Sequence, residues 1–179
     1  MKGRREMSEN IKTQVEIERK YIIAKPDSAL LIRMTGYTAD RITQDYLLGE
    51  VGTTRRVRAR ESEGRVRYYE TVKRKIDRMS SEESEREIDR EEYETLLESR
   101  DPACSTINKV RHSFLYEGQL FEIDVYPGWE HTCVMETELD TRERVVSIPP
   151  FIKVIAEVTG KREYSNASMA RCFPGELDS

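Results

Sequence analysis

Polar and apolar residues alternate with a period of two over most of this chain, and charged side chains occupy successive positions of the polar face. In the segment 14–23, for example, Glu16, Glu18 and Lys20 alternate with Val15 and Ile17. Successive side chains of a β-strand point to opposite faces of the sheet, so a period of two is typical of strands. We therefore predict a fold built mainly from strands that each carry one charged face.

The same alternation recurs along the chain and predicts about eight strands. They are expected at residues 14–23, 43–48, 53–61, 65–75, 84–88, 106–116, 120–126 and 133–139. Helices are expected at 25–33, at 89–100 with Asp89 as N-cap and an end at Pro102, and from Ser165 or Asn166 onward, since capping residues come before helical patterns there. These elements make one α+β domain.

Composition narrows the classes of function. The 179 residues include 30 Lys and Arg against 34 Asp and Glu, so the net charge is only −4. This balance does not suit a strongly basic nucleic-acid binder. No apolar run reaches the roughly 18 residues of a membrane span. We therefore expect a cytoplasmic protein with no nucleic-acid or membrane partner.

Two histidines, His112 and His131, offer little material for an imidazole metal site or a Ser-His-Asp triad. The three cysteines are widely spaced and odd in number, which argues against a disulfide framework. Any metal chemistry must therefore rest on carboxylates.

Two interpretations of the charged faces remain open at this point. On any single strand, the simpler one is the solvent-exposed face of an antiparallel sheet. Taken together, however, the strands carry charges with little of the Thr, Ser, Gln and Asn that usually accompany them. If the sheet closes into a barrel, clustered Arg and Lys would suit a polyanion, and carboxylates at positions i and i+2 could share a hard divalent cation. That combination favours phosphoryl chemistry.

The charged pairs also resemble the motifs of a known family. The run from Glu16 to Lys20 is similar to the ExExK signature of the CYTH superfamily, also called triphosphate tunnel metalloenzymes. Later pairs match the family in order: RxR at Arg56 and Arg58, TxK at Thr71 and Lys73, ExE at Glu85 and Glu87, KxR at Lys109 and Arg111, ExD at Glu122 and Asp124, and ExE at Glu136 and Glu138. The ending EVTGKREYSNASMA resembles the bacterial triphosphatase-like branch of that family.

This resemblance implies a closed, eight-stranded antiparallel β tunnel with flanking helices. It implies a tunnel domain over residues 14–172, with a flexible N-terminus at 1–13 and a tail at 173–179. It implies Mg²⁺ or Mn²⁺ as the cofactor and a triphosphate-containing small molecule as the partner. Whether the protein forms a homodimer, through helices or loops, stays open.

The resemblance also implies roles for individual residues. Substrate-binding positions are Lys20, Arg56, Arg58, Arg60, Lys73, Lys109 and Arg111, where the run RVRAR leaves two registers for the RxR pair. Metal-binding positions are Glu16, Glu18, Glu122, Asp124, Glu136 and Glu138. Catalytic positions are Lys73, Glu85, Glu87 and Asp124, one of whose carboxylates would orient or deprotonate the attacking water.

The function expected from these features is metal-dependent hydrolysis of inorganic tripolyphosphate or a nucleoside triphosphate. In this mechanism water attacks the terminal phosphoryl group while the basic residues stabilise the developing charge. Three alternatives remain: a class IV adenylyl cyclase-like activity, a thiamine triphosphatase activity, and non-catalytic binding of polyphosphate.

Overall fold

The structure is a computed structural model, and it describes residues 12–177. Strands dominate this part of the chain. In chain order the elements are β1 (Lys12–Ala24), α1 (Ser28–Leu31), β2 (Thr35–Leu47), β3 (Thr53–Ser62), β4 (Arg65–Lys75), β5 (Ser80–Ile88), α2 (Arg90–Leu97), β6 (Ile107–Tyr116), β7 (Gln119–Val125), β8 (Thr132–Leu139), β9 (Val154–Glu157), the 3₁₀ helix η1 (Arg162–Tyr164) and α3 (Asn166–Arg171).

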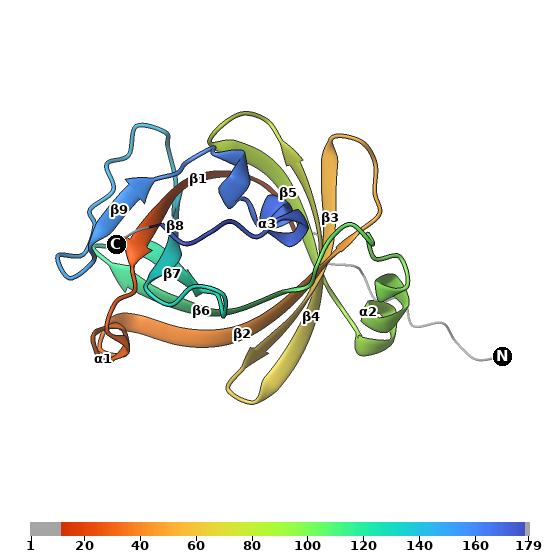
Figure 1. Ribbon diagram of the computed structural model, residues 1–179, viewed down its shortest axis with the longest axis horizontal. Coiled ribbons are helices and arrows are strands. Elements are labelled where there is room, and N and C mark those ends of the chain that lie inside the picture. Colours follow the sequence, from red (N-terminus) through yellow and green to blue (C-terminus); the bar gives the residue numbers. More distant parts are fainter. Residues whose placement is uncertain (1–11, 178–179) are drawn as a thin grey trace.

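The strands β1 to β8 close into an antiparallel barrel, shown in Figure 1. Closure depends on the long strand β1. One edge of β1 pairs with β8 over Ile17–Ala24, while residues Lys12–Ile17 pair with β5. The short strand β9 then pairs with β1 beyond β5, over residues 21–23. The expected closed barrel of eight antiparallel strands with flanking helices is thus confirmed, with β9 as an additional strand.

Two-residue turns join neighbouring strands of the barrel. Glu63 and Gly64 between β3 and β4 have φ values of 49° and 76°, and Glu117 and Gly118 between β6 and β7 have 48° and 73°. Positive φ at both central residues is the geometry of a type I′ hairpin turn, whose twist matches that of the flanking strands. Glycine at the second position makes this conformation accessible.

Three apolar clusters hold the barrel together. On its outside, Phe114, Phe121 and Ile123 pack under α1, while Val57 and Ile88 pack under α2. The third cluster packs Tyr164 of η1 and Met169 of α3 against inward-facing strand residues, which include Ile22, Ile107 and Val134. One end of the barrel interior is therefore apolar and covered by the C-terminal helices. The remainder of the interior is left to charged side chains.

The element boundaries differ from expectation in several places. Strand β5 begins at Ser80 rather than at residue 84, and α1 spans only Ser28–Leu31 rather than 25–33. Strand β2 begins at Thr35 rather than at residue 43, because its pairing with β6 extends along that whole segment. Helix α2 starts after its Asp89 N-cap as predicted but ends at Leu97, ahead of Pro102. α3 begins at Asn166 with Ser165 as N-cap, as predicted.

The structure also describes part of each end of the chain. Residues 12 and 13 of the expected flexible N-terminus pair with β5, and 1–11 lie outside the described residues. The expected tail packs on the barrel as far as it is described, since the Glu176 carboxylate accepts hydrogen bonds from the backbone N–H groups of residues 130–132. Within the described range, no helix combines the length and apolar character that crossing a membrane requires.

Candidate functional site

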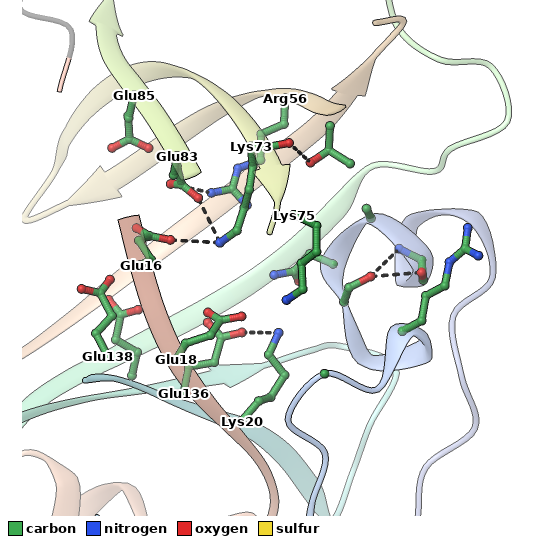
Figure 2. Close-up of a pocket in the computed structure, with 18 of the residues that line it drawn as sticks. Glu16, Glu18, Lys20, Arg56, Lys73, Lys75, Glu83, Glu85, Glu136 and Glu138 are labelled. Carbon is green, nitrogen blue, oxygen red and sulfur yellow. Dashed lines mark hydrogen bonds and ion pairs between the residues drawn. The ribbon is translucent and has the colours of Figure 1, made fainter. Parts of the chain in front are cut away.

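A cavity of about 980 Å³ lies inside the barrel. Its walls are the inward faces of the strands, so charged residues that lie far apart in the sequence meet there, as Figure 2 shows for ten labelled side chains. Six basic residues on these walls are called the inner cations below: Lys20, Arg56, Arg58, Lys73, Lys109 and Arg111. The acidic residues from the strand walls are Glu16, Glu18, Glu83, Glu85, Glu122, Glu136 and Glu138.

Strands β3, β4 and β5 bring three of these cations against two carboxylates. Arg58 forms an ion pair with Glu85, and Arg56 Nη2 lies 3.4 Å from Glu83 Oε1. Lys73 Nζ lies 3.1 Å from Glu83 Oε2 and 2.9 Å from Oε2 of Glu16 on β1. Burial lowers the pKa of Lys73, but the charges of Glu18, Glu83 and Glu16 outweigh it and raise the pKa above the usual lysine value.

A second group forms around Asp124, which is fully buried. Its Oδ2 lies 2.5 Å from Lys109 Nζ, and the Arg111 guanidinium donates to both Oδ atoms at 2.7 Å. Burial raises the pKa of Asp124, but Arg111 and Lys109 bring it below the usual range. Burial and the neighbouring Arg111 lower the pKa of Lys109 to about 8.

A third group links β1, β6, β7 and β8. Lys20 Nζ lies 2.7 Å from Glu136 Oε1, and Arg111 Nη2 lies 2.9 Å from Glu136 Oε2. Arg111 also pairs with Glu122. Burial raises the pKa of Glu136, yet Lys20 and Arg111 hold it well below its usual value. Every inner cation therefore has a carboxylate partner.

Two carboxylates of the cavity differ from the others in their side-chain contacts. Glu18 on β1 and Glu138 on β8 are directly opposite each other in the β1–β8 register. Within residues 12–177, neither has a hydrogen bond or ion pair through its side chain. Burial, together with the charges of Glu16 and Glu122, raises the pKa of Glu138. The carboxylates on this side of the cavity repel one another.

The structure gathers most of the expected site residues in one cavity but leaves two outside it. Asp124 does not line the cavity, and its two oxygens are occupied by Lys109 and Arg111. Glu87 is exposed and is also absent from the cavity lining, because it lies beyond the last pairing of β5 with β1 in the described residues.

Arg60 lines the same cavity as Arg56 and Arg58, so both registers of the RVRAR run point inward. Its Nε lies 2.9 Å and its Nη2 2.5 Å from Oδ2 of Asp40, a fully buried residue of β2. The other oxygen of Asp40 is buried without a hydrogen-bond partner among the described residues. Arg60 is therefore neutralised separately from the inner cations.

Some residues of the cavity were missed in the sequence. Glu83 lies two positions before Glu85 on the same face of β5, and it was missed because the predicted strand began only at residue 84. Tyr46 of β2 lines the cavity, and its hydroxyl accepts a 2.9 Å hydrogen bond from Nε2 of the buried Gln44. Asp40, which does not line the cavity but pairs with Arg60, was missed because the predicted strand began only at residue 43.

Comparison with known proteins agrees with this architecture. The CYTH domain model matches residues 14–172. A curated protein from Acetivibrio thermocellus, named inorganic triphosphatase, is 30% identical over 159 residues, which cover 87% of this chain and 93% of that protein.

Solved structures are similar as well. The crystal structure of the inorganic triphosphatase NE1496 has 28% sequence identity and a TM-score of 0.55, covering 89% of this chain and 97% of that one. The structure of PH1819 from Pyrococcus horikoshii OT3 has 19% sequence identity and a TM-score of 0.56. The match covers 71% of this chain and 80% of that one, and the two proteins share the fold. The family match and the 30% identical relative show that this chain belongs to the CYTH domain family, also known as triphosphate tunnel metalloenzymes.

Proposed function

We propose that this protein hydrolyses the terminal phosphoryl group of a triphosphate-containing small molecule, with inorganic tripolyphosphate as the preferred substrate. The observation that carries the proposal is the convergence of six cations, from β1, β3, β4 and β6, on one cavity. The relatives named inorganic triphosphatase, which align with most of the chain, support the same chemistry.

The basic residues are suited to phosphate oxygens. The Nε atoms of Arg56 and Arg58 are buried and have no hydrogen-bond acceptor among the described residues. A buried N–H group without an acceptor costs roughly 1–3 kcal/mol, and a phosphate oxygen would remove that cost. Guanidinium groups also match phosphate in bidentate geometry. We assign Arg56, Arg58 and Lys73 to the phosphoryl groups, with Lys20, Lys109 and Arg111 along the opposite strands and Arg60 at the edge.

The carboxylates now paired with these cations would have to give way to the substrate. A triphosphate that takes over Arg56 and Lys73, for example, leaves Glu83 without partners. Carboxylates released in this way need a positive charge, since an unpaired charge inside a protein is costly.

A divalent cation fits this requirement. Mg²⁺ and Mn²⁺ prefer oxygen ligands, and the donors available beside the cavity are carboxylates that already repel one another. Among the described residues, no three potential ligands are yet gathered around one point, so the side chains would turn on binding. We propose that Glu16, Glu18 and Glu138 hold the ion, with Glu122 and Glu136 nearby. When bound, it would neutralise phosphate charge and act as a Lewis acid.

Glu85 is the carboxylate that we propose to orient the attacking water. Of the three carboxylates expected for this role, it alone lines the cavity. It accepts a 2.9 Å hydrogen bond from Thr71 Oγ1 and pairs with Arg58, which fixes its position beside the basic residues. Lys73, protonated at neutral pH, would stabilise the charge that develops on the transferred group.

The test is an assay of purified protein with tripolyphosphate, ATP and thiamine triphosphate, each with Mg²⁺, with Mn²⁺ and with a chelator. We expect phosphate release to be fastest from tripolyphosphate and to stop with the chelator. Cyclic AMP from ATP would indicate a cyclase instead. Tight binding of tripolyphosphate with no turnover of any substrate would reduce the protein to a binding module.

A further inference from the structure

Tyr126 connects the charged cavity to the C-terminal tail. It directly follows the last residue of β7, two positions after Asp124, and is only 2% exposed. Lys109 Nζ lies over the Tyr126 ring, 5.9 Å from its centroid. The Tyr126 hydroxyl donates a 2.7 Å hydrogen bond to Oδ1 of Asn166, the first residue of α3. Lys109 and Asn166 both line the cavity, whereas Tyr126 does not. Tyr126 can therefore act on a substrate only through its neighbours.

The Lys109 ammonium is held in place by few contacts. It carries three N–H donors, and Asp124 is its one hydrogen-bond partner among the described residues. A second contact is the face of the Tyr126 ring. An aromatic face attracts a cation within about 6 Å, and the attraction is strongest where water is excluded. The Lys109 side chain is only 1% exposed. The ion pair and the ring together therefore fix the position of the ammonium.

The C-terminal tail packs on Tyr126 through two aromatic side chains. Phe173 and Trp129 meet the Tyr126 ring edge-on, with centroid distances of 5.6 and 5.8 Å, and their own rings lie 5.5 Å apart. Trp129 Nε1 donates a 3.1 Å hydrogen bond to the carbonyl oxygen of Pro174. Gly128 leaves room for Phe173, since a Cβ at Gly128 would lie 3.3 Å from Cε1 of that ring. The tail therefore limits how the Tyr126 ring can turn.

Further contacts fix the tail on the loop between β7 and β8. Glu176 accepts hydrogen bonds from the backbone N–H groups of residues 130–132, which directly follow Trp129. Leu177 packs against the apolar cluster that contains Tyr126 and Trp129. In Figure 1, the chain after α3 runs back across the barrel to reach this loop. The contacts form a continuous series from the tail, through Tyr126, to Lys109.

We propose that Tyr126 is a positioning residue for Lys109, and that tail residues 173–177 hold Tyr126 in the orientation that this requires. The inference rests on the proposed function, in which Lys109 binds a phosphoryl group of the triphosphate. The ring keeps the ammonium at the cavity wall while a phosphate oxygen competes with Asp124 for it. Binding in the cavity and docking of the tail are then coupled, and such coupling is reciprocal.

The first experiment compares Tyr126→Leu, which removes the ring, with Tyr126→Phe, which removes only the hydroxyl. The dissociation constant of tripolyphosphate is measured by calorimetry and kcat/KM by phosphate release, at a temperature where melts show each variant folded. We expect the Leu variant to lose roughly 3- to 30-fold in both, the value of a buried contact between a cation and a ring. The Phe variant should stay within about threefold of the wild type, because it keeps the ring. Equal losses in the two variants would overturn the proposal.

Tyr93→Leu is the matched control. Tyr93 of α2 is a buried tyrosine, 8% exposed, that packs on Tyr68 and does not line the cavity. Its loss should lower the Tm but leave tripolyphosphate affinity and kcat/KM unchanged. A loss of affinity in this control as large as that in Tyr126→Leu would show that general destabilisation explains both. If Tyr126→Leu does not fold, Tyr126→Met takes its place, since Met fills the same space without a ring face.

A double-mutant cycle tests whether Tyr126 acts through Lys109. Lys109→Met removes the ammonium and keeps a side chain of similar length, while Asp124 retains Arg111 as its partner. In that background Tyr126→Leu should change the dissociation constant less than about twofold, because the cation that the ring positions is already gone. The same loss in both backgrounds would mean that Tyr126 only packs, and would refute its positioning role. If Lys109→Met does not fold, the comparison of the Phe and Leu variants decides the question.

The tail is tested with Phe173→Ala. We expect a roughly 2- to 10-fold weaker affinity for tripolyphosphate, the value of a lost aromatic pair. Trp129 is the only tryptophan of the chain, so its fluorescence reports on the tail. Saturating tripolyphosphate should change that fluorescence in the wild type. Wild-type affinity in Phe173→Ala, with no change in fluorescence on binding, would contradict the coupling.

The same measurements separate this inference from the proposed function. Binding of tripolyphosphate without hydrolysis of any substrate would refute the proposed function, while the dissociation constants of the Tyr126 variants would still test the positioning role. Hydrolysis of tripolyphosphate with full affinity and full kcat/KM in Tyr126→Leu would support the proposed function and overturn the inference.

Discussion

Glu18 of β1 and Glu138 of β8 face each other across neighbouring strands, and neither carboxylate forms an ion pair or a side-chain hydrogen bond within residues 12–177. Two steps along β1, Lys20 is opposite Glu136 and pairs with it at 2.7 Å. Like charges directly opposite in a sheet are destabilising, and opposite charges are not. The pair of Lys20 and Glu136 therefore stabilises the contact between β1 and β8, whereas the pair of Glu18 and Glu138 opposes it. The pair of Glu18 and Glu138 is also the position where we propose that the cation binds.

Replacing Glu138 with Gln should stabilise the metal-free protein. Removing one of two opposed charges should recover up to about 1 kcal/mol, or an increase in Tm of up to roughly 4 °C. Since the pKa of Glu138 is raised in the folded state, its charge destabilises the fold above that pKa and the penalty disappears as pH falls through it. The variant's advantage should therefore vanish in acid.

The same variant tests whether the divalent cation binds at Glu138. Mg²⁺ should raise the Tm of the wild type more than that of Glu138→Gln, as measured by thermal melts with and without the ion. Glu143→Gln, which removes an exposed acid in the loop after β8, serves as the control. An identical Mg²⁺ response in all three proteins would place the ion elsewhere.

Replacing Lys73 with Ala should reduce tripolyphosphate turnover steeply while the fold is retained. Loss of one preorganised charged donor in an active site typically costs about 10²–10³ in kcat. Arg74→Ala is the matched control, because Arg74 is the next residue on β4, is largely exposed and pairs with Glu82 outside the cavity. Steady-state kinetics on both variants would contradict our site if Lys73→Ala retained wild-type kcat.

Asp124→Asn should act mainly on stability. It removes the carboxylate between two buried cations, which costs about 3–5 kcal/mol when a charge is left uncompensated. Arg111 keeps Glu136 and Glu122, so we expect the lower end of that range. Urea denaturation measures the change, and tripolyphosphate should restore part of it. A variant that is as stable as the wild type but inactive would instead make Asp124 a catalytic residue.

Glu176→Gln should remove part of the protein's sensitivity to acid. The Glu176 carboxylate accepts hydrogen bonds from the N–H groups of Glu130, His131 and Thr132, and these outweigh burial to lower its pKa to about 2. A depressed folded pKa contributes stability that is complete above the usual value near 4.5 and is lost as pH falls toward 2. Melting temperatures between pH 7 and pH 2 should therefore fall less in the variant. Parallel curves would show that the contact does not hold the tail.

Much of the barrel could be predicted because it depends on local patterns. Alternation places Glu16, Glu18 and Lys20 on one face of β1, whatever the strand pairs with. Glycine at the second position of each two-residue turn favours the hairpins β3–β4 and β6–β7. The closed fold itself was expected from the resemblance to the CYTH superfamily, because no local pattern encodes closure.

The register of the strands could not be predicted in the same way. On β5 the residues Glu83, Glu85 and Glu87 share one face, and the sequence does not distinguish them. In the structure, Glu83 lies opposite Lys73 on β4, and Glu85 is the last residue of β5 to pair with the described part of β1. Glu83 therefore enters the cavity, and Glu87 is left exposed.

The sequence by itself determined which residues share a strand face, and hence which charges could enter a common interior, because side-chain direction alternates with every residue. Only the tertiary structure decided which charges meet. Three contacts join different strands or segments: the burial of Asp124 between Lys109 and Arg111, the pairing of Arg60 with Asp40, and the close approach of Gly160 to Arg78. Such contacts depend on how eight strands are staggered around one axis, which is a property of the closed barrel as a whole.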